Sequence, residues 1–186
     1  MADDKRAAND PLKNQEPDPR MDEFKKAPDQ WKEVMNMEWG SDRTAASSLQ
    51  TLIMDADPDQ YPGLEKKLIA LAGDPKCSAL GVDFACRMLR LVGTAASVPA
   101  LSKLLADEKT ADPARYALQL IPGAEVDSAL REALGTLKGK AKAGLIGTIS
   151  ARGDKEALAA IKTCVAEGGD VGDAASQAVI TLGGEQ

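Results

Sequence analysis

Basic side chains recur along this chain in helical runs spaced about one repeat apart, and these are the residues whose types and spacing best support binding chemistry. Arg87 and Arg90 fall in one apolar run, Arg115 in the next, and Lys140 and Lys142 in the one after. Guanidinium and ammonium groups bind carboxylates through charge-assisted hydrogen bonds. If these helices stand in register, the side chains form a basic ladder inside a chain of formal net charge −6. Such a ladder predicts a surface that holds an acidic peptide or another carboxylate-bearing surface.

A second interpretation of the same cations is internal pairing with acids at helix ends. The acids in question are Asp74, Asp83, Asp107 and Asp112. In that case the basic residues would join neighbouring helices and would not contact a ligand. The sequence leaves both interpretations open.

A further cluster comprises Lys138, Lys140 and Lys142, with Arg152 and Lys155 nearby. Nucleic-acid sites combine such charges with interleaved aromatic residues, which this stretch lacks. The acidic balance of the chain also opposes binding to a phosphate backbone. We therefore expect these side chains to be solvated at helix ends, and we predict no nucleic-acid partner.

Catalytic chemistry finds little support in the residue types. The chain has no histidine, which excludes a His-based triad and a His metal ligand. Cys77, Cys86 and Cys164 form no CxxC pair, so we expect reduced thiols, with Cys86 and Cys164 on buried helix faces. Glycines do not form a phosphate-binding motif, and Tyr116 is expected in the core with its hydroxyl at the rim. The sequence predicts no enzyme, no cofactor and no metal.

The elements that position these residues are predicted to be helix pairs. In the helix expected over 98–106, Val98, Leu101, Leu104 and Leu105 share one face. Its partner over 113–121 carries Tyr116, Ala117, Leu120 and Ile121 as the predicted buried stripe. Further helices are predicted over residues 41–56, 61–72, 77–92 (with Leu80, Phe84, Met88 and Leu91 inward), 125–137, 140–151, 155–166 and 171–182. Gly144 and Gly147 either weaken the 140–151 helix or permit close approach of a neighbouring helix.

The unit repeats along the chain. Gly93, Gly123, Gly153 and Gly183 each follow an apolar helical run and are 30 residues apart. A fixed period near this length, carried by helix pairs, is typical of an α-solenoid. Aromatic residues make up only 3% of the chain, so small and branched aliphatic side chains must fill the core.

The N-terminal region differs from the repeats. Residues 1–20 are rich in Asp, Asn, Lys and Pro and are predicted to be a disordered tail. Residues 21–40 form an aromatic segment with Phe24, Trp31 and Trp39 near helical spacing. It is interpreted either as a helix that caps the first repeat or as a docking helix for a partner. Residues 41–186 form the repeat domain. The tail has no apolar signal region, no stretch has transmembrane length, and the cysteine count is odd, so we expect a cytoplasmic protein.

Several stretches resemble bacterial HEAT-repeat proteins of the planctomycete and phycobilisome-lyase type. They are FACR (84–87), LVGTAASVPAL (91–101), LLADE (104–108), ARYAL (114–118), ALREALG (129–135) and LIG (145–147). The resemblance covers roughly residues 61–183. It implies a right-handed α-α superhelix of about four to five helix pairs, with the second helices lining a concave face and Asp–Arg pairs joining neighbouring repeats. Family members are mostly interaction scaffolds.

The predicted function is a non-enzymatic interaction module or scaffold. Its concave face, centred on Arg87, Arg90, Arg115 and Lys142, is expected to bind a segment of a protein partner. One alternative, implied by the resemblance, is a bilin-lyase-like protein acting on phycobiliproteins. Another is a structural assembly subunit that docks through Phe24, Trp31 and Trp39.

Overall fold

Residues 28–183 form an all-α structure in the computed structural model, which describes this part of the chain. Within that range lie ten α-helices, and no strand occurs. The α-helices are α2 (Pro28–Met35), α3 (Thr44–Met54), α4 (Tyr61–Gly73), α5 (Ala79–Val92), α6 (Val98–Leu105), α7 (Ala111–Leu118), α8 (Ala124–Leu134), α9 (Gly139–Arg152), α10 (Leu158–Cys164) and α11 (Gly169–Thr181). Short 3₁₀ helices precede or follow some of them: η1 (Pro58–Gln60), η2 (Ala95–Ser97), η3 (Lys155–Ala157) and η4 (Val165–Glu167).

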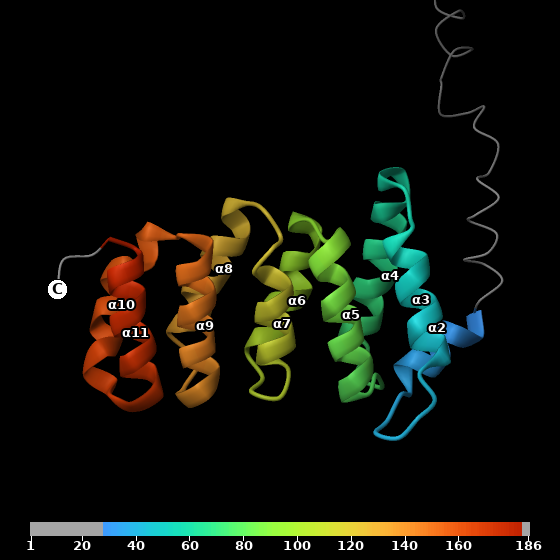
Figure 1. The fold of residues 1–186 in the computed structure, drawn as a ribbon, viewed down its shortest axis with the longest axis horizontal. Helices are drawn as coiled ribbons and strands as arrows, with labels where there is room; N and C mark the ends of the chain where they lie inside the picture. The colour runs from blue at the N-terminus through green and yellow to red at the C-terminus, as the bar shows by residue number, and fades with distance from the viewer. Residues whose placement is uncertain (1–27, 184–186) are drawn as a thin grey trace, which may run out of the picture.

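From α4 onward the helices pack in successive pairs, as Figure 1 shows. α4 packs on α5, α6 on α7, α8 on α9, and α10 on α11. The second helices α5, α7, α9 and α11 lie side by side and form what we call the second-helix layer, while α4, α6 and α8 are neighbours in the other layer. α2 and α3 pack on each other and on α5 at the N-terminal end. The predicted all-α class is confirmed, and the repeat-like arrangement is compatible with an α-solenoid.

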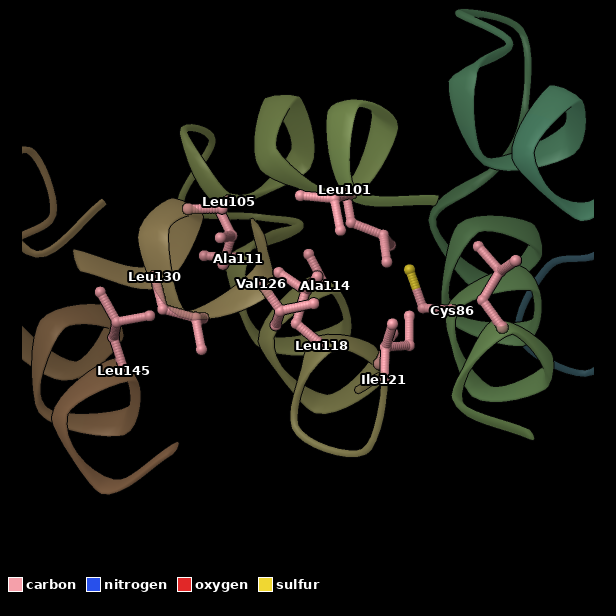
Figure 2. Packing of buried hydrophobic residues seen from close by; sticks show 14 of the residues in the cluster. Cys86, Leu101, Leu105, Ala111, Ala114, Leu118, Ile121, Val126, Leu130 and Leu145 are labelled. Carbon is pink, nitrogen blue, oxygen red and sulfur yellow. The ribbon is translucent and has the colours of Figure 1, made fainter. Parts of the chain in front are cut away.

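The core between the two layers consists of small and aliphatic side chains (Figure 2). Leu101 and Leu105 of α6 point toward Ala114 and Leu118 of α7, all of them buried. Alanine at such positions lets neighbouring helices approach closely, which suits a chain with few aromatic residues. Cys86 is fully buried in the same core, as the sequence predicted.

Local sequence signals account for where several helices begin and end. Ser78 precedes α5, and its Oγ accepts a hydrogen bond from Gly81 N at 3.0 Å, the usual arrangement of an N-cap. α9 ends at Gly153, whose φ of 73° lies in the left-handed region that glycine tolerates. Gly93, which follows α5, has a φ of −72° that any residue could adopt, but an added Cβ would clash with the backbone oxygen of Leu89 and lie 2.8 Å from Ile121 Cδ1. Among the repeated glycines, Gly153 thus adopts a left-handed backbone conformation, whereas Gly93 permits close packing.

The structure corrects part of the predicted buried stripes. α7 spans Ala111–Leu118 and not 113–121, and its buried residues are Ala111, Ala114, Ala117 and Leu118, continued by Ile121 after the helix. With a period of 3.6 residues, this face excludes Tyr116 and Leu120, which are exposed. Leu91 of α5 is exposed for the same reason. The predicted 155–166 helix is also shorter, because α10 covers only Leu158–Cys164 between two 3₁₀ turns.

Candidate protein-binding surface

Arg90 of α5 reaches across to the end of α7. Its Nη1 donates hydrogen bonds to Tyr116 O at 2.6 Å and to Gln119 Oε1 at 3.4 Å. The guanidinium carbon also lies 3.9 Å from the centroid of the Tyr116 ring. This is a cation–π contact as well as a hydrogen-bonded one. Arg90 thus ties two helices of the second-helix layer together while its neighbourhood stays open to solvent.

Two leucines lie beside this contact at equivalent positions of α5 and the end of α7. Leu89 and Leu118 are fully buried, and two residues after each of them come Leu91 and Leu120, which are 52% and 56% exposed. Tyr116 is exposed as well. Large apolar side chains rarely gather on the surface of a protein without a role in contact.

Arg87 completes this surface on α5. It lies one turn before Leu91, its side chain is 61% exposed, and its Nε donates to Asp83 Oδ2 at 2.8 Å. An exposed i,i+4 pair of this kind is weak and is easily rearranged by a ligand. We call Arg87, Arg90, Leu91, Tyr116 and Leu120 the Arg90–Tyr116 patch.

Arg115 and Lys142, the other two predicted ladder residues, occupy interhelix contacts. Arg115 Nε bonds Asp112 Oδ1 at 2.7 Å, and its Nη1 donates to Thr148 Oγ1 on α9 at 3.4 Å. Lys142 Nζ on α9 is largely buried and contacts Glu167 Oε1 at 2.5 Å. The structure therefore places Arg87 on the exposed face of α5 and Arg90 across the α5–α7 contact with part of its side chain exposed. Arg115 and Lys142 lie in other contacts between helices.

The ion pair between Lys142 and Glu167 shifts the pKa of both side chains. The hydrogen bond from Lys142 holds the pKa of the Glu167 carboxyl below its usual value. The same bond raises the pKa of the Lys142 ammonium, against a smaller effect of burial. Both groups are therefore charged at neutral pH.

The four aspartates that the sequence offered as internal partners of these cations fall into two groups. Asp83 and Asp112 do pair with arginines, as that interpretation expected. Asp74 and Asp107 instead accept backbone hydrogen bonds, from Lys76 N at 2.8 Å and from Lys109 N at 3.0 Å, and so shape turns. Internal pairing thus accounts for part of the basic ladder but not for Arg90, whose hydrogen-bond acceptors are neutral.

Arg152 of α9 has a role that the sequence did not indicate. Its Nη1 donates to Leu118 O at 2.9 Å and Ile121 O at 2.7 Å, at the end of α7, and its Nε bonds Asp127 Oδ1 at 2.6 Å. Because this side chain is turned inward, it does not join Lys138 and Lys140 in a solvated cluster, as had been expected.

Arg131 and Glu65 were also missed. Arg131 of α8 binds both carboxylate oxygens of Asp154, at 2.7 and 2.8 Å. Glu65 of α4 is buried and accepts hydrogen bonds from Thr94 N and Ser97 Oγ, both at 2.6 Å, in the turn that precedes α6. A single glutamate in a helix offers no sequence signal for such a cap, because its partners lie 29 and 32 residues away.

The predicted N-terminal aromatic residues separate from one another. Trp31 of α2 packs against the core, with Lys67 Nζ 5.4 Å from its ring centroid, and lines a shallow apolar groove of about 410 Å³ with Met35 and Leu71. Trp39 is 87% exposed and lies in the turn before α3. Phe24 lies outside the described residues. Trp31 thus behaves as the capping interpretation expects, whereas Trp39 projects from the surface.

The Trp39 turn is well fixed. Ser41 N donates to Glu38 O at 3.1 Å, Glu38 N donates to Ser41 Oγ at 2.9 Å, and Gly40 has a φ of 84°. Ser78 Oγ of the α5 cap donates to Met37 O at 2.7 Å and anchors the turn to the fold. Trp39 is therefore held away from the core by a constrained backbone.

The cysteines of the described region are unpaired. Burial raises the pKa of the Cys86 thiol to about 12, and that of Cys77 to about 11 with help from Asp74. Both are protonated at neutral pH and are poor nucleophiles in that form. Over residues 28–183, no cluster of acidic or cysteine side chains is arranged to hold a metal ion, and none of the helices has the length and apolarity to cross a membrane.

Comparison with known proteins leaves the family open: no family model, curated protein or solved structure matches this chain. The likeness to HEAT-repeat proteins therefore stays a prediction from the sequence stretches themselves.

Proposed function

We propose that this chain is a non-enzymatic protein-binding module that acts as a scaffold, built as a right-handed superhelix of the HEAT type. Stacked helix pairs and the 30-residue spacing of glycines support the architecture. The pairing of Arg131 on α8 with Asp154, just before η3 of the next helix pair, agrees with the Asp–Arg contacts that the resemblance implies between repeats. Three unpaired cysteines support the cytoplasm as its location.

The single observation that carries the proposed function is the Arg90–Tyr116 patch. It combines two arginines, a tyrosine and two exposed leucines from α5, α7 and the turn that follows α7. Arg and Tyr are enriched among the residues that dominate binding energy in protein interfaces. The underlying helices are fixed by a closely packed core, so the surface is presented without a large ordering cost.

Affinity capture with a matched set of baits tests this function. The baits are the full chain, the double variant Leu91→Asp/Leu120→Asp, and the control Met54→Asp, which changes an exposed apolar residue on α3. A partner that binds through the patch is retained by the full chain and the control and is lost from the double variant. Equal retention by all three baits would refute binding at this surface.

A second candidate function, a subunit that docks into a larger assembly, is favoured by Trp39. A tryptophan that is 87% exposed on a fixed turn suits insertion into an apolar pocket of a partner. Substitution Trp39→Ala in the same capture experiment separates the two functions. Loss of the partner with Trp39→Ala, and not with Leu91→Asp/Leu120→Asp, supports docking through the turn.

A further inference from the structure

The charges around the Arg90–Tyr116 patch do not cancel. Asp83 is engaged by Arg87, and Asp112 is engaged by Arg115. The described contacts of Arg90 are all with uncharged groups: the carbonyl of Tyr116, its ring, and the amide oxygen of Gln119. The surplus positive charge of this surface therefore resides on Arg90, although the chain as a whole is acidic.

The guanidinium of Arg90 is already oriented for a ligand. Its hydrogen bonds to the described residues run through Nη1, and its face lies on the Tyr116 ring. A guanidinium offers five N–H donors in a planar fork, and a stacked, hydrogen-bonded arginine loses little further freedom on binding. A carboxylate is the group that matches this fork in charge and geometry.

Apolar surface flanks the cation. Leu120 lies one turn after Tyr116, on whose ring Arg90 stacks, and Leu91 lies one turn after Arg87 on the exposed face of α5. A small carboxylate would leave both leucines exposed, because an open helix surface does not enclose it. A polypeptide segment can cover the leucines and neutralise Arg90 together.

We propose that the Arg90–Tyr116 patch recognises an acidic–apolar segment of a partner protein, with a carboxylate on Arg90 and apolar side chains on Leu91 and Leu120. This inference rests on the proposed function and specifies the partner at the same site. The predicted basic ladder is thereby reduced to one anchoring arginine, with Arg87 beside it. Arg115 and Lys142 support the helices and do not contact the segment.

The test begins with selection from a displayed library of random short peptides. The full chain is the bait, and the Leu91→Asp/Leu120→Asp variant removes peptides that bind elsewhere. Peptides that survive are expected to carry Asp or Glu within about four residues of Leu, Ile, Met or an aromatic residue, the reach of one helical turn or two strand positions. If no peptide prefers the full chain to the variant, the proposed function itself is refuted.

Synthetic copies of the selected peptides then test Arg90. Arg90→Gln is expected to weaken binding about tenfold or more, as for loss of a hydrogen bond to a charged group. Lys66→Gln, the same loss of charge at an exposed position of α4, should leave affinity unchanged. Circular dichroism and thermal unfolding verify that the variants are folded.

A double-mutant cycle separates contact from a merely structural effect. Replacing the peptide carboxylate by its amide should lower the affinity for the full chain by the same factor of about ten. It should hardly change the affinity for the Arg90→Gln variant. The carboxylate contact would be refuted if the selected peptides lacked acidic residues. It would also be refuted if the amide peptide bound the full chain and the Arg90→Gln variant with equally reduced affinity. Neither result would contradict binding at the patch.

Discussion

The guanidinium group of Arg115 lies directly against the backbone of Gly144, and this contact joins α7 to α9. A Cβ added to Gly144 would sit 2.7 Å from Arg115 Nε and 3.0 Å from its Cζ. Gly147, one turn later on the same helix, has open space around it. The sequence allowed either glycine to weaken the helix or to permit close approach of a neighbour. In the structure Gly144 permits a close approach, and Gly147 does not.

Substitution by alanine is expected to separate these roles. Gly147→Ala should raise the free energy of unfolding by about 1 kcal/mol, because alanine favours the helix and meets no neighbour. Gly144→Ala should raise the free energy of unfolding by about 1 kcal/mol less than Gly147→Ala does, because Arg115 must move away from Thr148. Urea unfolding measures both. In an Arg115→Ala background the two substitutions should become equal, and equal gains in the unaltered chain would contradict the contact.

Glu65 is expected to be among the residues that matter most for stability. Glu65→Ala leaves the donors of Thr94 and Ser97 without their acceptor in a buried turn. The expected loss is about 3 kcal/mol in the free energy of unfolding, measured with denaturant. Lys66→Ala, the exposed neighbour on α4, serves as the control and should change stability little. A loss below about 1 kcal/mol at Glu65 would show that solvent replaces the cap.

The fold class and most helices were predictable because they depend on local periodicity. Apolar residues at helical spacing, together with Gly and Pro at the ends, placed α4 and α6 within one residue of their observed ends. α7 was harder, because Tyr116 and Leu120 also fit a helical stripe beside Ala117. Which stripe is buried depends on the neighbouring α5 and α6, and this information is not local. The handedness of the stack stays a prediction.

The candidate surface was only partly predictable for the same reason. The sequence placed Arg87, Arg90, Arg115 and Lys142 on successive second helices, and they do lie there. Their rotation about each helix axis differs, so Arg87 faces solvent. Arg90, Arg115 and Lys142 instead reach a neighbouring element. The exposed leucines were expected in the core. Binding by the predicted residues stays a prediction until a partner is tested.

Fluorescence should distinguish the two tryptophans. With Trp39→Phe, the remaining Trp31 is expected to emit at shorter wavelength and to resist acrylamide quenching, because it packs against the core. With Trp31→Phe, the exposed Trp39 should emit at longer wavelength and be quenched readily. The reverse order would contradict the placement of both residues. In the Trp31→Phe protein, a blue shift on addition of a captured partner would indicate docking at the Trp39 turn.

The Lys142–Glu167 ion pair predicts how stability depends on pH. The folded pKa of Glu167 is lowered, so its contribution is complete above the ordinary value of 4.5 and is lost as the pH falls through the folded pKa. The folded pKa of Lys142 is raised, so its contribution is complete below the ordinary value of 10.5 and is lost as the pH rises through the folded pKa. Glu167→Gln should therefore destabilise the chain between these limits, and the difference should shrink toward both extremes. Denaturant unfolding at a series of pH values measures this, with Glu132→Gln as the control for an exposed glutamate on α8. A difference that does not change with pH would mean that the amide substitution acts through packing and not through charge.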